Sequence, residues 1–358
     1  MRSSLLSHSL VQTGNVRVAR STKSSKVGLL VAVAVVALLA AVPYWAQAST
    51  MRTLISFLTL LALAQMWNML AGYAGLLSVG QQAFIGLGAY SLWAFTDQLG
   101  VHPFLAVPLA GLVAVVMAVP TGALAFRLRG GYFAIGTWVI AEVFRLVVAN
   151  SNWLGGGSGR TVTAASRLAI QTRIQGTYWL ALVVAVSAVL AVYLLLRSRL
   201  GLALTAIRDN ETGAESLGVH VTRAKWVVFL ISAFGVGVTG AVIYLNLLRI
   251  QPDAAFSINW TAFMIFIVVI GGIGTIEGPI LGTIVYFTLQ ETLSSYGSWY
   301  LILLGLVAIV VTVKAPRGLW GLLTKYLDVQ LFAVQRRVQM PYPDSLRVEK
   351  TEGAGEPA

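Results

Sequence analysis

The stretch of residues 53–96, TLISFLTLLALAQMWNMLAGYAGLLSVGQQAFIGLGAYSLWAFT, contains no charged residue. One bilayer crossing takes about 20 residues of helix, so this stretch is long enough for two crossings. Its apolar runs are continuous and do not alternate, which excludes a membrane β-barrel. Over the whole chain 11% of the residues are charged, whereas a soluble domain has roughly a quarter. The sequence therefore predicts an all-α polytopic membrane protein.

Hydrophobic segments recur along the chain and predict about ten transmembrane segments, some broken by glycines. They are residues 27–46, 53–71, 83–95, 103–126, 132–148, 178–196, 226–248, 261–271, 279–293 and 299–313. With the N-terminus inside, an even number of crossings places the basic residues 127–129, 197–225 and 314–317 in the cytoplasm, as the positive-inside rule requires. We therefore expect both termini to be cytoplasmic (N-in, C-in). The 149–177 loop breaks the rule, because its arginines would lie outside.

The chain divides into one membrane domain and two tails. Residues 1–26 are basic and Ser-rich, and residues 326–358 are rich in proline and glycine towards their end. We expect both tails to be cytoplasmic and disordered, with the membrane domain at 27–325. The tripeptide 46–48, AQA, has the small-x-small form of a signal-peptidase site. A cleaved leader is the alternative, but the long basic region and the many following spans favour a retained helix.

A polar segment, RSRLGLALTAIRDNETGAESLGVHVTRAK at residues 197–225, separates two apolar segments. Asp209 can cap a short helix over residues 210–217, because its carboxylate accepts the free N–H groups of the following turn. Gly218 then provides the left-handed residue that ends the helix. This helix would present Ala214 and Leu217 on one side and could dock a partner. An ordinary solvated loop is the alternative.

Two glycine-rich stretches interrupt the apolar segments. GLLSVGQQAFIGLGAY at 75–90 and GGIGTIEGPILGTIVY at 271–286 share two glycines and a tyrosine at matching offsets, which hints at an internal duplication. Non-helical backbone at membrane depth needs protein or a water-filled cavity around it, so both stretches should lie in the interior.

Polar side chains within the spans are the candidates for a translocation path. They are Gln65, Asn68, Gln81, Gln82, Glu142 and Glu277. Glu142 has the alternative of an ion pair with Arg145, three residues later. Glu277 has the alternative of capping a half-helix that begins at Pro279.

The signatures of enzymes and of metal sites are missing. The chain has no cysteine, and His8, His102 and His220 are too far apart in sequence to form a metal-binding spacing. GGGSGRT at 155–161 departs from a phosphate-binding loop, with Leu154 in place of the first glycine and Arg160 in place of the lysine. The net charge of +12 is explained by cytoplasmic loops, so we expect no nucleic-acid partner. We expect no catalysis, no metal and no cofactor in this chain.

Five stretches resemble the permeases of branched-chain amino acid ABC transporters, specifically the LivM-like subunit. They are NMLAGYAGLLSVGQQAFIGLGAY (68–90), RGGYFAIGTWVIAEVFRLV (129–147), AIRDNETGAESLGVHVTRAKWVVFLISA (206–233), VVIGGIGTIEGPILG (268–282) and APRGLWGLL (315–323). The resemblance runs in order from about residue 53 to 323. LGGGSG at 154–159 is similar to the external Gly-rich loop of the family. The long N-terminal tail is not a general family feature.

The resemblance implies an ABC importer subunit for leucine, isoleucine and valine in the bacterial inner membrane. Its partners would be a second homologous permease, two cytoplasmic ATPases and an extracytoplasmic solute-binding protein, all acting at the lipid bilayer. The loop at 197–225 would dock on an ATPase through the coupling residues Arg208, Asp209, Glu211 and Glu215, with Gly218 ending the helix. Three alternatives stay open: an importer of urea, amides or other amino acids, an ion-coupled secondary transporter, and a structural membrane protein.

Overall fold

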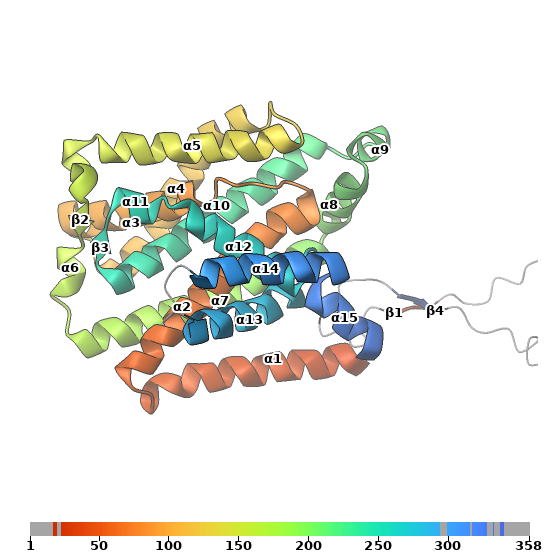
Figure 1. Ribbon diagram of the computed structural model, residues 1–358, viewed down its shortest axis with the longest axis horizontal. Helices are drawn as coiled ribbons and strands as arrows, with labels where there is room; N and C mark the ends of the chain where they lie inside the picture. Colours follow the sequence, from red (N-terminus) through yellow and green to blue (C-terminus); the bar gives the residue numbers. More distant parts are fainter. Residues whose placement is uncertain are drawn as a thin grey trace, which may run out of the picture.

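Apolar helices run side by side along one direction of the molecule, the horizontal direction of Figure 1. The computed structural model describes residues 17–19, 23–293, 299–315, 317–327, 332 and 337–339. Within these residues the structure is helical apart from turns, loops and two short pairs of strands. This confirms the predicted all-α class.

Each of the ten predicted segments corresponds to a helix. These are α1 (Lys23–Ala41), α2 (Ala48–Asn68), α3 (Gln82–Trp93), α4 (Pro103–Ala125), α5 (Gly131–Ala149), α7 (Ile170–Arg197), α10 (Val221–Leu247), α12 (Ile258–Gly271), α13 (Glu277–Leu293) and α14 (Trp299–Lys314). The largest difference in boundary is at α7, which begins eight residues before the expected position. Hydropathy missed this first part because it contains Gln171, Arg173 and Gln175.

Six of the described helical stretches are long and apolar enough to cross a membrane. They are Ala48–Tyr73, Pro103–Ala125, Gly131–Ala149, Ile170–Arg197, Val221–Leu247 and Pro252–Gly271. A pair bent by 43°, Ile302–Lys314 and Gly318–Tyr326, makes a seventh if it counts as one span. Other segments are shorter, such as α3 with 12 residues and α13 with 17, against the roughly 20 that one crossing takes.

Short elements lie at the two ends of the helices (Figure 1). The end on the right, called the α9 end below, has α8 (Arg199–Asp209), α9 (Glu211–Ser216), α15 (Gly318–Leu327) and the antiparallel strands β1 (Arg17–Ala19) and β4 (Arg337–Gln339). The left end, called the α6 end, has β2 (Arg160–Thr161), α6 (Thr163–Ser166), β3 (Arg249–Ile250), α11 (Pro252–Ala255) and the 3-10 turns Val42–Tyr44, Asn152–Leu154 and Gly156–Ser158. Each predicted tail thus contributes one strand, and the other tail residues lie outside the described part, apart from 23–26 in α1, 326–327 in α15 and Phe332.

The helix α10 lies at the centre and packs against α4, α3, α2 and α7. Its buried face includes Ala233, Gly237 and Ala241. A Cβ atom added to Gly237 would lie 2.4 Å from the Cβ of Ala114 in α4. Small residues allow this close approach, which is how apolar helices associate inside a bilayer.

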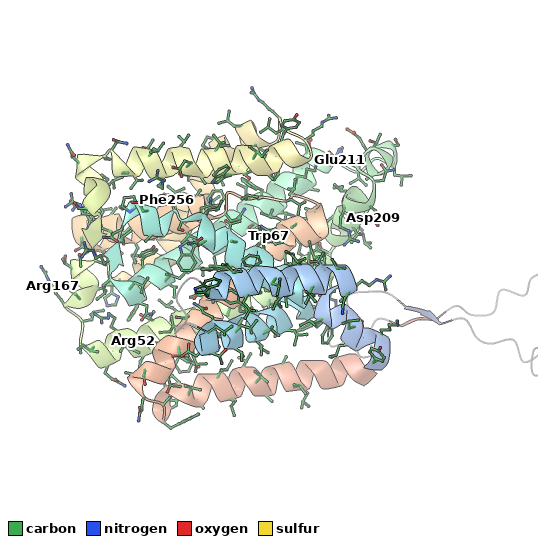
Figure 2. All side chains as sticks on the ribbon, viewed as in Figure 1. Arg52, Trp67, Arg167, Asp209, Glu211 and Phe256 are labelled. Carbon is green, nitrogen blue, oxygen red and sulfur yellow. The ribbon has the colours of Figure 1, made fainter. Side chains whose placement is uncertain are left out.

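The first glycine-rich stretch breaks the helical path between α2 and α3. The helix α2 continues as a π-helix, Met69–Tyr73, and residues 75–80 are not helical. The Trp67 indole donates to the Ser78 carbonyl oxygen at 2.8 Å, and the Val79 N–H donates to Thr137 Oγ1 at 3.1 Å. Trp67 lies in the interior of the helices in Figure 2. Protein therefore covers part of this break, as its non-helical backbone requires, whereas Gly75 and Leu77 are exposed.

Candidate functional site

The polar loop at 197–225 folds into two short helices at the α9 end, where Figure 2 shows Asp209 and Glu211. Ser198 caps α8 by accepting from the Leu200 N–H at 3.2 Å, and Asn210 caps α9 by accepting from the Gly213 N–H at 2.9 Å. The predicted cap, Asp209, is wrong, because Asp209 is the last residue of α8. Its carboxylate instead lies 3.2 Å from the Arg208 guanidinium.

The charged side chains of this loop face outward. Asp209, Glu211 and Glu215 are exposed, and Glu211 also pairs with Lys225 at 2.7 Å. Gly218 follows α9 with φ of 82°, which confirms the predicted left-handed residue. Ala214 is buried, whereas Leu217 is 84% exposed. The prediction that they share one side is wrong, since Leu217 already lies past the last helical residue. The loop can therefore present two carboxylates, Asp209 and Glu215, to a basic partner.

Arg208 differs from its neighbours, because it reaches back into the protein. Its Nη1 atom donates to the carbonyl oxygen of Gly72 at 2.9 Å. Gly72 belongs to the π-helical end of α2, 136 residues earlier in the chain. The side chain thus joins α8 to the membrane helices.

Asn68 and Gln65 hold the loop between α12 and α13. The Asn68 Oδ1 atom accepts from the Gly274 N–H at 2.9 Å, and its Nδ2 donates to the Thr275 carbonyl oxygen at 2.8 Å. The Gln65 Nε2 atom donates to the Ile276 carbonyl oxygen at 2.7 Å. Gln65 and Asn68 are fully buried. Both amides therefore supply hydrogen bonds to the backbone of the segment that connects α12 to α13.

Gln81 and Gln82 lie at the start of α3 and are also buried. The Ser232 hydroxyl of α10 lies within hydrogen-bond distance, 3.3 Å, of Gln81 Oε1. The Thr261 hydroxyl of α12 donates to Gln82 Oε1. The structure thus brings four of the six predicted path residues into interhelical contacts between α2, α3, α10, α12 and the loop before α13.

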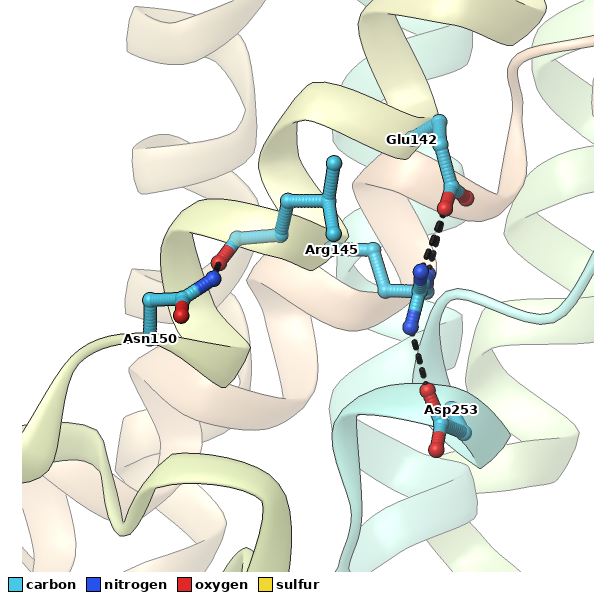
Figure 3. Close-up of polar contacts among 5 residues, drawn as sticks. Glu142, Arg145, Asn150 and Asp253 are labelled. Atoms are coloured by element: carbon cyan, nitrogen blue, oxygen red, sulfur yellow. Dashed lines mark hydrogen bonds and ion pairs between the residues drawn. The ribbon is translucent and has the colours of Figure 1, made fainter.

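Glu142 forms the ion pair that was its alternative. The Arg145 guanidinium lies 2.5 Å from Glu142 Oε1 and 2.5 Å from Asp253 Oδ1, so the two carboxylates flank it (Figure 3). Asp253 belongs to α11, so the triad of Glu142, Arg145 and Asp253 joins α5 to α11 at the α6 end. The Glu142 and Asp253 side chains are 42% and 81% exposed. Solvated pairs of this kind stabilise a fold only weakly.

Glu277 is the first residue of α13 and is buried. The helix begins two residues before the position expected from Pro279. The Glu277 Oε1 atom accepts from the Phe332 N–H at 3.1 Å. A carboxylate in the first turn also suits the positive end of the helix dipole.

A cavity of about 380 Å³ opens between α2, α10, α12 and α13. Apolar and aromatic side chains such as Trp260 and Phe287 line it together with Arg52, Asn246 and Gln290. Arg52 lies towards the α6 end in Figure 2. None of the predicted path residues lines this cavity. Sequence reasoning missed these polar residues, although Arg52 stands directly before the charge-free stretch.

The sequence matches the family model for the branched-chain amino acid transport system / permease component over residues 47–312. The chain belongs to this family. It is a multi-pass membrane protein of a transport family, not an enzyme. Its resemblance to branched-chain amino acid permeases is therefore confirmed.

Individual relatives agree with this assignment. The chain is 28% identical to the high-affinity branched-chain amino acid transport system permease protein LivM of Salmonella typhimurium (strain LT2), over 70% of this chain and 65% of the relative. It is 27% identical to the Escherichia coli (strain K12) protein of that name, with the same coverage. It is 26% identical to the ribose import permease protein RbsC of Haemophilus influenzae, over 36% of this chain and 41% of the relative. The chain thus spans just under two thirds of the length of the two LivM proteins. No solved structure matches it.

Proposed function

We propose that this chain is a permease subunit of an ABC importer for leucine, isoleucine and valine. The observation that carries the proposal is the family match over residues 47–312, which includes the helices from α2 to α13 and the 197–225 loop. The LivM relatives bear the substrate class in their names. An apolar amino acid needs polar groups only at its backbone end, which suits spans with few charges.

The partners follow from the same proposal. A second homologous permease would complete the path, two ATPases would bind at the α9 end, and a solute-binding protein would deliver substrate at the α6 end. Asp209, Glu211 and Glu215 are the proposed ATPase-coupling residues of the exposed loop, together with Arg208 and Gly218. We propose no nucleic-acid partner and no metal or cofactor held by this chain itself.

The proposed topology has ten crossings, with both termini in the cytoplasm. Its support is the direction of the helices in Figure 1, where the start of α1 and the end of α14 both lie at the α9 end. That end also has the turn with Arg127 and Arg129, as the positive-inside rule favours. Arg160, Arg167 and Arg173 of the 149–177 loop are exceptions to the rule, as is Arg52, which also lies at the α6 end. Among them, Arg160 donates to the Trp153 carbonyl oxygen at 2.7 Å and lies 5.0 Å from the Trp93 ring, so protein groups hold its charge.

The translocation path remains a proposal that includes Gln65, Asn68, Gln81, Gln82, Glu142 and Glu277. In the structure their polar groups join helices and loops, so a path along them requires some of these contacts to exchange for contacts with substrate. Movement of α2 relative to α12 and α13 would do this. A cavity of about 380 Å³ lies between the same helices and α10, which supports movement there.

The rival from another class is a secondary transporter driven by H⁺ or Na⁺. Such a protein needs acidic relays within its membrane helices. Here Glu142 is paired with Arg145, and Glu277 accepts a backbone hydrogen bond. These contacts of Glu142 and Glu277 support the proposal of an external energy source, supplied by ATPase subunits.

The energy source and the substrate can be tested in cells. Bacteria without their own branched-chain amino acid uptake would express this chain together with its proposed partners. We expect labelled leucine uptake that stops on depletion of ATP and continues after a protonophore. Uptake abolished by the protonophore at unchanged ATP would favour the secondary transporter. Competition by urea or an amide, without competition by isoleucine or valine, would keep the mechanism and change the substrate.

A further inference from the structure

Three segments that are far apart in sequence touch at the α9 end. They are the π-helical end of α2, the 272–276 loop and α8. A Cβ atom added to Gly72 would lie 2.6 Å from the Gly274 nitrogen, and one added to Gly274 would lie 3.0 Å from Arg208 Nη1. The backbones at Gly72 and Gly274 are therefore in direct contact, and only glycines fit there. This contact is called the glycine crossing below.

The Arg208 guanidinium contacts this crossing from α8. Its bond to the Gly72 carbonyl oxygen, at 2.9 Å, lies at the C-terminal end of a helix, where carbonyl groups lack helical donors. The partial negative charge of a helix C-terminus also favours a cation there. The bond is thus charge-assisted, which makes it stronger than an ordinary hydrogen bond.

The crossing itself is held together by Asn68. Its amide binds both Gly274 and Thr275, so the end of α2 and the 272–276 loop form one hydrogen-bonded unit. Gln65 adds a third bond, to Ile276, one turn earlier on α2. Arg208 therefore donates a hydrogen bond that joins α8 to a unit made from the end of α2 and the second glycine-rich stretch.

We propose that Arg208 is a positioning residue that ties α8 to this crossing, so that displacement of the 197–225 loop moves the end of α2 and the 272–276 loop together. The proposal rests on the proposed function, because it deepens how an ATPase would drive the membrane helices. It gives Arg208 a role inside this chain, in contrast to Asp209 and Glu215, whose side chains point outward. Loss of Arg208 would leave docking intact and would disconnect it from transport.

Hydrogen exchange on the purified full chain tests the tie without any assumption about substrate. We expect Arg208→Ala to increase exchange of the 272–276 amides about tenfold, as loss of a charged hydrogen bond predicts. The matched control is Arg129→Ala, since Arg129 is also exposed, lies between α4 and α5 at the α9 end but outside the 197–225 loop, and forms no ion pair among the described residues. Equal exchange in both variants and the wild type would overturn the tie.

A transport assay measures what the loss of the Arg208 hydrogen bond does to the function. In vesicles that contain the complete set of subunits, Arg208→Ala should retain ATPase binding and hydrolysis but move roughly tenfold less leucine per ATP. Arg129→Ala should match the wild type. Loss of ATPase binding in parallel with uptake would overturn the proposal and make Arg208 a docking contact. Wild-type vesicles that hydrolyse ATP without moving leucine would contradict the proposed function, and hydrogen exchange would still decide the tie.

A covalent substitute gives a second test, because the chain has no cysteine of its own. A Cβ atom on Gly75 would lie 4.0 Å from the Arg208 Cβ, within the range of a disulfide. Oxidation of the double variant Gly75→Cys, Arg208→Cys should restore the leucine moved per ATP, and reduction should remove it again. Gly75→Cys alone controls for the positive φ of 68° at that position. A formed disulfide that leaves transport uncoupled would overturn the proposal.

Discussion

Asn68 illustrates how one buried side chain can satisfy a loop that has no regular secondary structure. The 272–276 loop exposes backbone N–H and C=O groups inside the protein, and each would be costly without a partner. Asn68 accepts from one residue of this loop and donates to the next, at 2.9 and 2.8 Å. An amide is suited to this because it has donors and an acceptor on the same group.

Replacement of Asn68 by leucine should therefore destabilise the protein by about 1–3 kcal/mol, the cost of leaving a buried polar group unpaired. Denaturation in mixed micelles would measure the free energy of unfolding. Thr288→Val is the control, because Thr288 is exposed and its hydroxyl donates to the Ile284 carbonyl oxygen of its own helix. If both variants unfold at the same denaturant concentration, Asn68 does not hold the loop.

The close contact between Gly72 and Gly274 leads to a steric prediction at the residue scale. Gly72→Ala places a methyl group 2.6 Å from the Gly274 nitrogen and 2.3 Å from Asn68 Oδ1. Neither neighbour can withdraw without breaking a hydrogen bond, so we expect a loss of about 1–3 kcal/mol, typical of overpacking. Gly131→Ala, with no heavy atom within 4 Å of the new methyl group, should keep wild-type stability. Equal thermal stability of Gly72→Ala and the wild type would show that the segments are farther apart.

At the scale of elements, the exposed face of α8 and α9 is the part of the 197–225 loop that a partner can recognise. Asp209 and Glu215 are exposed, while Ala214 anchors α9 to the core. The α9 cap and the Glu211–Lys225 pair involve other residues. Charge reversal of this face removes the exposed Asp209–Arg208 ion pair but keeps the α9 cap, the Glu211–Lys225 pair and the buried Ala214.

The double variant Asp209→Lys, Glu215→Lys should abolish uptake and leave insertion and abundance near normal. Like charges would then oppose a basic ATPase surface, which costs several kcal/mol at an interface. Co-purification of the ATPases should fall in parallel, unlike in Arg208→Ala. Full uptake by the double variant would return this loop to the solvated alternative.

Hydropathy predicted ten apolar segments, and the described residues have a helix at each of them, because a long apolar run has few other ways to fold in a bilayer. Local detail was less predictable. Asp209 and Asn210 are both good capping residues, and which one caps α9 depends on where α8 ends. Contacts between distant parts of the chain could not be predicted from the sequence. Gln65 and Ile276, for example, are 211 residues apart. The sequence indicated Gln65 and Asn68 as candidates for the translocation path and Arg208 as a coupling residue. It did not predict that all three lie around the glycine crossing.

At the scale of the whole molecule, the helices alternate in direction and keep the 197–225 loop at the same end as the start of α1 (Figure 1). This arrangement gives a topology prediction. A reporter active only outside the membrane should be silent when fused after residue 358. The same reporter should be active when fused after Leu248, which follows α10 at the α6 end. The opposite result at either position would contradict the ten-crossing topology.

Reconstitution in vesicles tests the central claim most directly, namely that this chain conducts substrate while other subunits supply the energy. Leucine accumulation would be measured for the chain alone and for the complete set with a second permease, two ATPases and a binding protein. We predict accumulation only with the complete set and only with ATP on the side of the ATPases. Accumulation by the chain alone, driven by a proton or sodium gradient, would contradict the account.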